Sequence, residues 1–192
     1  QGWLFGRPGP LAPPAAAPAR PVALTAPVTV ERHASPFQAV TRARGDVRRA
    51  DKRLLLALSL QLEHQAAALG ETALIVSAFQ TDERFTELTR RRYTLLGADA
   101  AFVAALGVGM DPEPAPGVRG ASIAGDDPLL GEWSVAVLGP HFAAALVAVD
   151  VGDQGPEMER RFDFALTYDR DLVVEAASAL MRRVQPVAPI PA

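Results

Sequence analysis

The sequence contains no cysteine, which excludes disulfides and thiolate metal sites. Its three histidines stand far apart, and none has the HxxxH or HExxH spacing of a metal site. No apolar run approaches the roughly 20 residues that a membrane-spanning helix needs. No secretory signal precedes the first expected element. We therefore expect a soluble, cytoplasmic protein.

The chain also lacks an excess of basic charge. It has 19 lysines and arginines against 22 acidic residues, a net charge of −3. The arginines stand among acids, as in "TRARGDVRRADKR" and "TDERFTELTRRRY". Such mixtures are more typical of solvated helix faces than of phosphate-binding patches. Neither nucleic acid nor a membrane is expected as a partner.

Motifs of catalysis are missing as well. There is no GxSxG, Walker A or GxGxxG pattern, and "GVGMDPEPAPG" has no lysine and runs into prolines rather than a helix. Asp126 and Asp127 in "GDDP" predict a turn rather than a catalytic pair. We expect His33 at the linker border, His64 on a solvent-facing side of a helix and His141 at a loop tip to be exposed and without a role. The sequence thus favours a non-enzyme.

Proline and alanine are abundant instead, and they mark the organisation of the chain. Residues 8–27 are rich in both and show almost no periodicity, which predicts an extended linker. Ser35 can cap a helix whose first residue is Pro36, so we place the folded domain at 35–186. Residues 1–34 then precede the domain, and 187–192 form a tail.

Hydrophobic periodicity predicts the elements of this domain. Helices are expected in "SPFQAVTRARGDVRRA", "ADKRLLLALSLQLEHQAAALG", "ERFTELTRRRYTLLG" and "DRDLVVEAASALMRRV". Strands are expected in "TALIVSAF", "AAFVAALGV", "VRGASIAG", "RRFDFALTYD" and on both sides of Gly139-Pro140. In the third helical stretch Phe85, Leu88, Tyr93 and Leu96 would form the apolar side.

The order of these elements predicts the fold class. The first two strands flank a helix, which favours parallel pairing through a crossover, and the later strands favour an antiparallel meander. We therefore predict an α/β fold of one domain, a mixed sheet of about five or six strands with helices packed on it.

A candidate ligand site lies at the end of the first strand. In "SAFQTDERF" the buried strand ends at Phe79, and Gln80 stands just before a helix, where open α/β sheets bind ligands. The amide of Gln80 can orient a small ligand or can cap the following helix. Trp133 and Phe142 could line the same pocket, although a core position is the favoured alternative for the tryptophan.

Three segments resemble the DICT sensory domain of bacterial signalling proteins. They are "KRLLLALSLQLEHQAAALGETALIVSAFQ", "DPLLGEWSVAVLGPHFAAALVAVD" and "RRFDFALTYDRDLVVEAASALMRRV", so the likeness covers about 35–184. The family occurs with diguanylate cyclase, phosphodiesterase or two-component modules. The resemblance implies a sensory role, and it leaves any cofactor and the identity of the signal unknown.

The first eight residues, "QGWLFGRP", are similar to the last motif of EAL-type phosphodiesterase domains, which hydrolyse cyclic di-GMP. The resemblance would give Gln1 the place of a glutamine near that active site. The EAL signature and the metal-binding carboxylates of the barrel are absent from this sequence, so Gln1 has no catalytic role here. We therefore expect residues 1–34 to be the end of an EAL domain plus a linker.

Two functions follow from these expectations. In the first, the domain binds a small signal or partner and modulates an attached EAL phosphodiesterase. In the second, it is a dimerisation or docking module that positions the phosphodiesterase domains. The apolar faces of "LVVEAASALM" and "SPFQAVTRARGDVRRA" would then form the contact surface, and a homodimer is a possible assembly.

Overall fold

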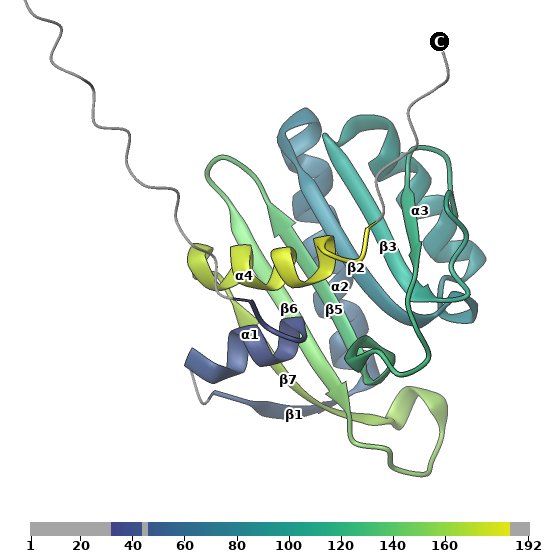
Figure 1. Ribbon diagram of the computed structural model, residues 1–192, viewed down its shortest axis with the longest axis vertical. Coiled ribbons are helices and arrows are strands. Elements are labelled where there is room, and N and C mark those ends of the chain that lie inside the picture. The colour runs from purple at the N-terminus through teal and green to yellow at the C-terminus, as the bar shows by residue number, and fades with distance from the viewer. Residues whose placement is uncertain (1–31, 44–45, 185–192) are drawn as a thin grey trace, which may run out of the picture.

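One mixed sheet organises the computed structural model, which describes residues 32–43 and 46–184 (Figure 1). Its four α-helices are α1 (Pro36–Ala43), α2 (Lys52–Leu69), α3 (Glu87–Asp99) and α4 (Arg170–Met181). Its strands are β1 (Arg48–Asp51), β2 (Leu74–Thr81), β3 (Phe102–Val108), β4 (Arg119–Ser122), β5 (Glu132–Leu138), β6 (Ala143–Asp150) and β7 (Arg161–Thr167). Short 3₁₀ turns include η3 (Asp82–Arg84) and η5 (Glu157–Glu159).

The strands are ordered β1-β7-β6-β5-β2-β3-β4. Strand β2 is parallel to β3, and α3 forms the crossover between them, as expected. Strands β5, β6 and β7 form the expected antiparallel meander, which joins the sheet beside β2. The predicted α/β fold, a single mixed sheet with helices packed on it, is confirmed.

The helices cover the two faces of the sheet in pairs (Figure 1). One apolar core holds side chains of α2, α3 and one face of the strands, including Leu55, Tyr93 and Phe162. The other core holds α1, α4 and the opposite face, including Val40 and Leu180. Alternation of side chains along each strand supplies both cores.

Capping residues set the helix boundaries. The Asp51 side chain accepts a hydrogen bond from the Leu54 amide at 3.0 Å and starts α2, and Gly70 ends it with φ 54°. The Ser35 Oγ accepts from the Gln38 amide at 3.3 Å at the start of α1, as its position predicted. The Asp169 carboxylate caps α4 in the same way.

The sequence expectation was wrong about one stretch. The segment 35–50 was expected to be a single helix, but α1 ends at Ala43 and Arg48–Asp51 form β1, which pairs antiparallel with β7. This strand brings the sheet to seven strands rather than five or six. Its charged side chains suit an exposed sheet edge, where Arg49 Nε donates to Asp163 Oδ1 at 2.7 Å.

The expected exposure of four further residues can be checked. His64 and His141 are exposed, as expected. His33 is not: it is 6% exposed, and its Nε2 lies 3.1 Å from Glu175 Oε2 on α4. Leu88 was expected on the buried side of its helix, yet it is 69% exposed because it lies in the first turn of α3, beyond the edge of the core.

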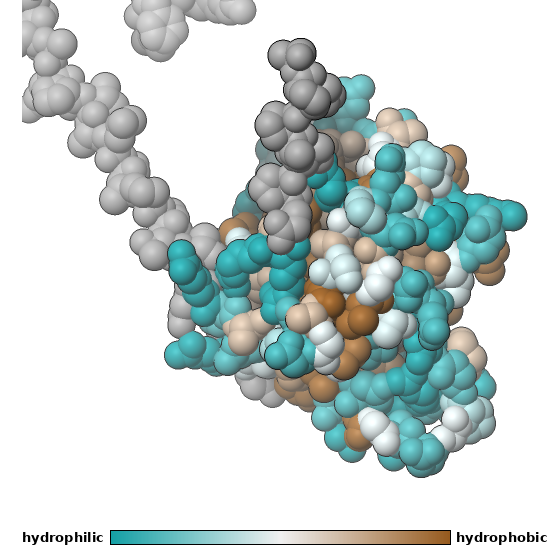
Figure 2. All heavy atoms as spheres, turned by 45° about the vertical axis from the view of Figure 1, so that its right-hand side comes forward, coloured by the Kyte–Doolittle hydropathy of each residue, from teal (hydrophilic) through white to brown (hydrophobic). Residues whose placement is uncertain are grey.

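The apolar face of α4 is not a free surface. Val173, Ala176 and Leu180 are buried against the sheet and α1, so the contact surface expected from "LVVEAASALM" does not exist. Figure 2 shows one side of the molecule, where hydrophilic side chains predominate and apolar ones gather toward the middle. No helix in the described part of the chain has the length and apolarity to cross a membrane.

Candidate functional site

A cavity of about 430 Å³ opens on the α2/α3 side of the sheet. It is lined by residues of α2 from Lys52 to Glu63, the start of α3, the end of β2, the starts of β5 and β7, and the 3₁₀ turns η3 and η5. Its volume lies within the range of about 300–1,000 Å³ typical of small-molecule sites. The cavity lies where β2 meets a parallel strand on one side and an antiparallel strand on the other.

Aromatic side chains form the floor of the cavity. Phe79 of β2, Trp133 of β5 and Phe162 of β7 all line it. The rings of Trp133 and Phe162 meet edge to face with centroids 5.9 Å apart, and Phe79 packs in the same way on Phe85 at 5.1 Å. Edge-to-face packing holds the rings in fixed orientations, so the floor is preformed.

Gln80 lines the same cavity and is strained. Its φ is +65°, the only positive φ of a non-glycine residue in the described part of the chain. The register between β2 and β3 shifts between Ala78 and Thr81, so Gln80 sits in a bulge. Bulges re-aim side chains beside functional sites, and a left-handed non-glycine residue costs of order 1–3 kcal/mol.

One stripe of α2 forms the wall opposite the floor. Lys52, Leu56, Ser59 and Glu63 are spaced four, three and four residues apart and all line the cavity. A helix rises 1.5 Å per residue, so this stripe extends over about 16 Å. Ser59 is 3% exposed, and its hydroxyl has no hydrogen-bond partner among the described residues. A buried hydroxyl without a partner is rare in folded proteins.

An ion pair closes one end of the stripe. Arg92 Nε of α3 donates to Glu63 Oε2 at 2.7 Å, and the Glu63 side chain is only 6% exposed. Burial raises the pKa of Glu63 above its ordinary value, against the opposing effect of the Arg92 hydrogen bond. This end of the cavity is therefore polar, and its two charges neutralise each other.

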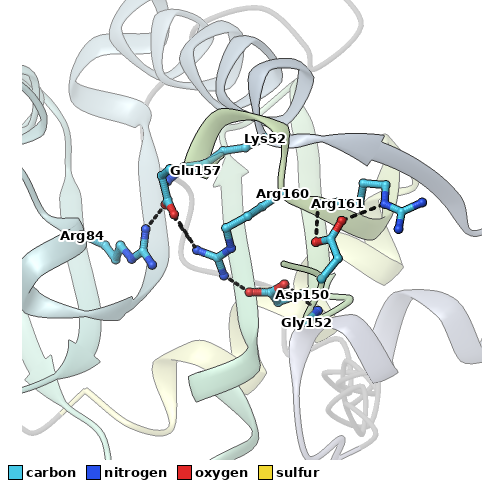
Figure 3. Close-up of polar contacts among 8 residues, drawn as sticks. Lys52, Arg84, Asp150, Gly152, Glu157, Arg160 and Arg161 are labelled. Atoms are coloured by element: carbon cyan, nitrogen blue, oxygen red, sulfur yellow. Dashed lines mark hydrogen bonds and ion pairs between the residues drawn. The ribbon is translucent and has the colours of Figure 1, made fainter. Parts of the chain in front are cut away.

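A cluster of cations stands at the opposite end (Figure 3). Lys52, Arg84 and Arg160 all donate to the carboxylate of Glu157 on η5, and Arg160 also pairs with Asp150. The Arg160 Nη1 lies 3.3 Å from each Glu157 oxygen. Hydrogen bonds from Lys52, and also from Arg84, hold the pKa of Glu157 below its ordinary value. Three cations therefore converge on one carboxylate at the rim of an apolar cavity.

The structure brings together three of the four predicted site residues. Phe79, Gln80 and Trp133 line one cavity, and Trp133 is half-buried there rather than enclosed in the core. Phe142 lies elsewhere: it follows the Gly139-Pro140 turn at the far end of β5, where its ring packs on Tyr168 with centroids 6.4 Å apart. The binding role of these residues remains a prediction.

The sequence analysis missed the polar residues of the cavity. The four-three-four spacing of Lys52, Leu56, Ser59 and Glu63 marks a helix face, and a serine within it was the available signal. No sequence pattern marked Glu157 as a site residue, because its partners Lys52 and Arg84 are 105 and 73 residues away in the chain. Asp127, expected in a turn, caps the turn at Pro128–Gly131 and pairs with Arg183.

The start of β5 connects the cavity to the opposite face. Trp133 points to the cavity, whereas its neighbour Glu132 points to α1, where Glu132 Oε2 accepts from the Phe37 amide at 3.1 Å. Glu132 is 4% exposed, and burial raises its pKa to about 7 against hydrogen bonds from Ser35 and Phe37. One strand residue thus contacts the cavity while the next holds the start of α1.

Comparison with protein-family models matches residues 37–150 to the DICT family, described as a sensory domain in diguanylate cyclases and two-component systems. The match covers more than half of the chain, and the chain belongs to this family. The matched segment contains the floor residues from β2 and β5 and the wall from α2, but not η5 or β7. Neither a curated protein nor a solved structure matched the sequence.

Proposed function

We propose that this sensory domain binds a small molecule in the cavity between α2, α3 and the sheet, and that binding modulates a module attached to it. The observation that carries the proposal is the cavity itself, with its aromatic floor and the unpartnered hydroxyl of Ser59. The surface that lines the cavity is mostly apolar, as in sites that bind small organic molecules.

The route from the cavity to the attached module is the start of β5. A ligand that displaces Trp133 would move Glu132 and hence the first turn of α1, which Glu132 holds through the Phe37 amide. The chain enters the domain at this point, and Arg182 and Arg183 hold it through the carbonyl oxygens of His33 and Ala34. A ligand that binds more tightly to one arrangement of residues 33–37 would shift the equilibrium between two states of the attached module. Such a coupling is typically worth about 1–3 kcal/mol.

The module on the N-terminal side is proposed to be an EAL phosphodiesterase. Support comes from "QGWLFGRP" and the proline- and alanine-rich stretch after it, both of which lie outside the described residues. The alternative, a dimerisation or docking module, loses the α4 surface. A different apolar surface, not expected from the sequence, is offered by Leu88 and Leu95 on α3, which are 69% and 72% exposed and seven residues apart on one helix face.

Native mass spectrometry of the purified chain, with an absorption spectrum of the same sample, tests ligand binding. We expect extra mass or visible absorption that is lost in Ser59→Phe, which fills the cavity, and retained in Ser178→Phe, a control on the other face. Thermal unfolding of both variants checks that each of them folds. A ligand retained equally in both variants would contradict the proposed site.

A further inference from the structure

The ionic cluster around Glu157 points to the chemical class of the ligand. We propose that the cavity binds an amphipathic anion, whose head group takes the place of the Glu157 carboxylate among Lys52, Arg84 and Arg160. This inference rests on the proposed function of the cavity, because it concerns the molecule that fills it.

The charges of the cavity support an anionic head group. Four cationic side chains line it, Lys52, Arg84, Arg92 and Arg160, against the acidic side chains of Glu63, Glu83 and Glu157. Arg92 is paired with Glu63 and Arg160 with Asp150, so their charges are compensated without Glu157. Lys52 and Arg84 have Glu157 as their shared carboxylate partner. An anion that replaces Glu157 keeps these charge-assisted hydrogen bonds.

Glu157 is well placed to be replaced. It lies in the connection between β6 and β7 (151–160), and its side chain is 50% exposed. Gly152 adopts φ 74° in that connection, and Met158, next to Glu157, lines the cavity and is 38% exposed. Glu157 therefore lies outside the paired residues of β6 and β7, and its half-exposed side chain can turn toward solvent while the Lys52 amide still holds the Arg160 carbonyl oxygen.

The remainder of the cavity suits an apolar body. Leu56 and Leu88 form walls above the floor of Phe79, Trp133 and Phe162. The stripe from Lys52 to Glu63 extends over about 16 Å at 1.5 Å per residue, enough for a chain of several carbons beyond the head group. Ser59 lies within this stripe, and its buried hydroxyl has no hydrogen-bond partner among the described residues.

The proposal can be tested with four ligands of one chain length: decanoate and decyl phosphate with anionic heads, decanol with a neutral head, and decyltrimethylammonium with a cationic head. Binding to the full chain is followed by the fluorescence of Trp133 in a Trp3→Phe background. We expect at least one anion to bind tenfold or more tightly than decanol and the ammonium compound. The comparison of decanoate with decyl phosphate tells a carboxylate from a phosphate head.

Two variants of the Arg84–Glu157 ion pair should change the affinity for anions in opposite directions. Glu157→Gln removes the competing carboxylate and should tighten anion binding several-fold, whereas Arg84→Gln removes a cation and should weaken it about tenfold. Decanol binding should change in neither variant. Glu159→Gln is the matched control, because Glu159 lies on the same turn but pairs with exposed Arg53 at 3.3 Å. A merely structural role of the pair would move both variants in the same direction.

The outcomes separate this inference from the proposed function. If decanol binds as tightly as the anions and Ser59→Phe blocks it, the cavity is a binding site and the anion assignment is overturned. If Glu157→Gln weakens anion binding, the replacement of Glu157 is overturned. If no ligand binds to the wild type or to Glu157→Gln, while the native sample loses a bound molecule in Ser59→Phe, the ligand is of another class.

Discussion

The two faces of the sheet are built differently. On the α1/α4 face small and branched side chains form the core, where alanines of β6 and α4 are buried with Leu180. On the α2/α3 face the aromatic rings of Phe79, Trp133 and Phe162 leave a cavity, with a strained Gln80 and an ionic cluster beside it. Both faces carry an apolar core, and the described cavity lies on the α2/α3 face.

The largest difference in the free energy of unfolding should appear when one leucine on each face is replaced by alanine. Leu180→Ala on the closed face should lower the free energy of unfolding by about 2–5 kcal/mol, because it removes a fully buried side chain. Leu88→Ala at the cavity rim should lower it by less than about 0.5 kcal/mol, because Leu88 is largely exposed. Urea unfolding measures both losses, and equal losses would contradict the difference in exposure between the two side chains.

The next largest effect is a change in the free energy of unfolding with pH. The pKa of Glu132 is raised to about 7 in the folded state from an ordinary 4.5, so the folded state holds a proton that the unfolded state has released between these values. Stability contributed by this group is present below pH 4.5 and falls as pH rises to 7, by up to about 3 kcal/mol. Glu132→Gln should remove this fall, and its carbonyl oxygen can still accept from the Phe37 amide.

The measurement is urea unfolding of wild type and Glu132→Gln from pH 5 to 8. The difference between them should grow with pH in favour of the variant. Asp163→Asn on β7 is the control, since the pKa of Asp163 is lowered by Arg49 and its titration falls below this range. A constant difference across the range would show that Glu132 does not titrate there.

A smaller effect is expected at the bulge. Gln80→Gly relieves the positive φ and should raise the free energy of unfolding by about 1 kcal/mol. The same change removes the amide that faces the cavity and should weaken ligand binding. Gln80→Ala is the matched variant that loses the amide but keeps the strain. If Gln80→Gly and Gln80→Ala are equally stable, the strain is not stored there.

The smallest effect is expected at Ser59. Ser59→Ala removes a buried hydroxyl that has no partner in the described structure, so stability should rise by up to about 1 kcal/mol. The hydroxyl of Ser77, bonded to Tyr93 at 2.6 Å, provides the contrast, because Ser77→Ala leaves the buried phenol unpaired and should destabilise. Destabilisation by Ser59→Ala would indicate a hydrogen bond that the structure lacks.

Local patterns predicted much of this architecture. The apolar runs of β2 and β3, the helical periodicity of leucine and alanine in α2 and the Gly139-Pro140 turn are local signals, and each gave the correct element. Strand β1 was missed because four residues with three charges look like a solvated helix face, and its pairing with β7 is a long-range contact. The place of Gln80 was anticipated, but its positive φ follows from the register of β2 against β3.

The most direct test of the account asks whether the two faces communicate. Amide hydrogen exchange of the chain is measured with and without saturating decanoate, with Ser59→Phe as the blocked control. The account predicts changed exchange in 151–160 near the head group and also at 35–38, where Glu132 holds α1 on the opposite face. Changes confined to the α2/α3 side, with 35–38 unaltered, would contradict coupling through β5.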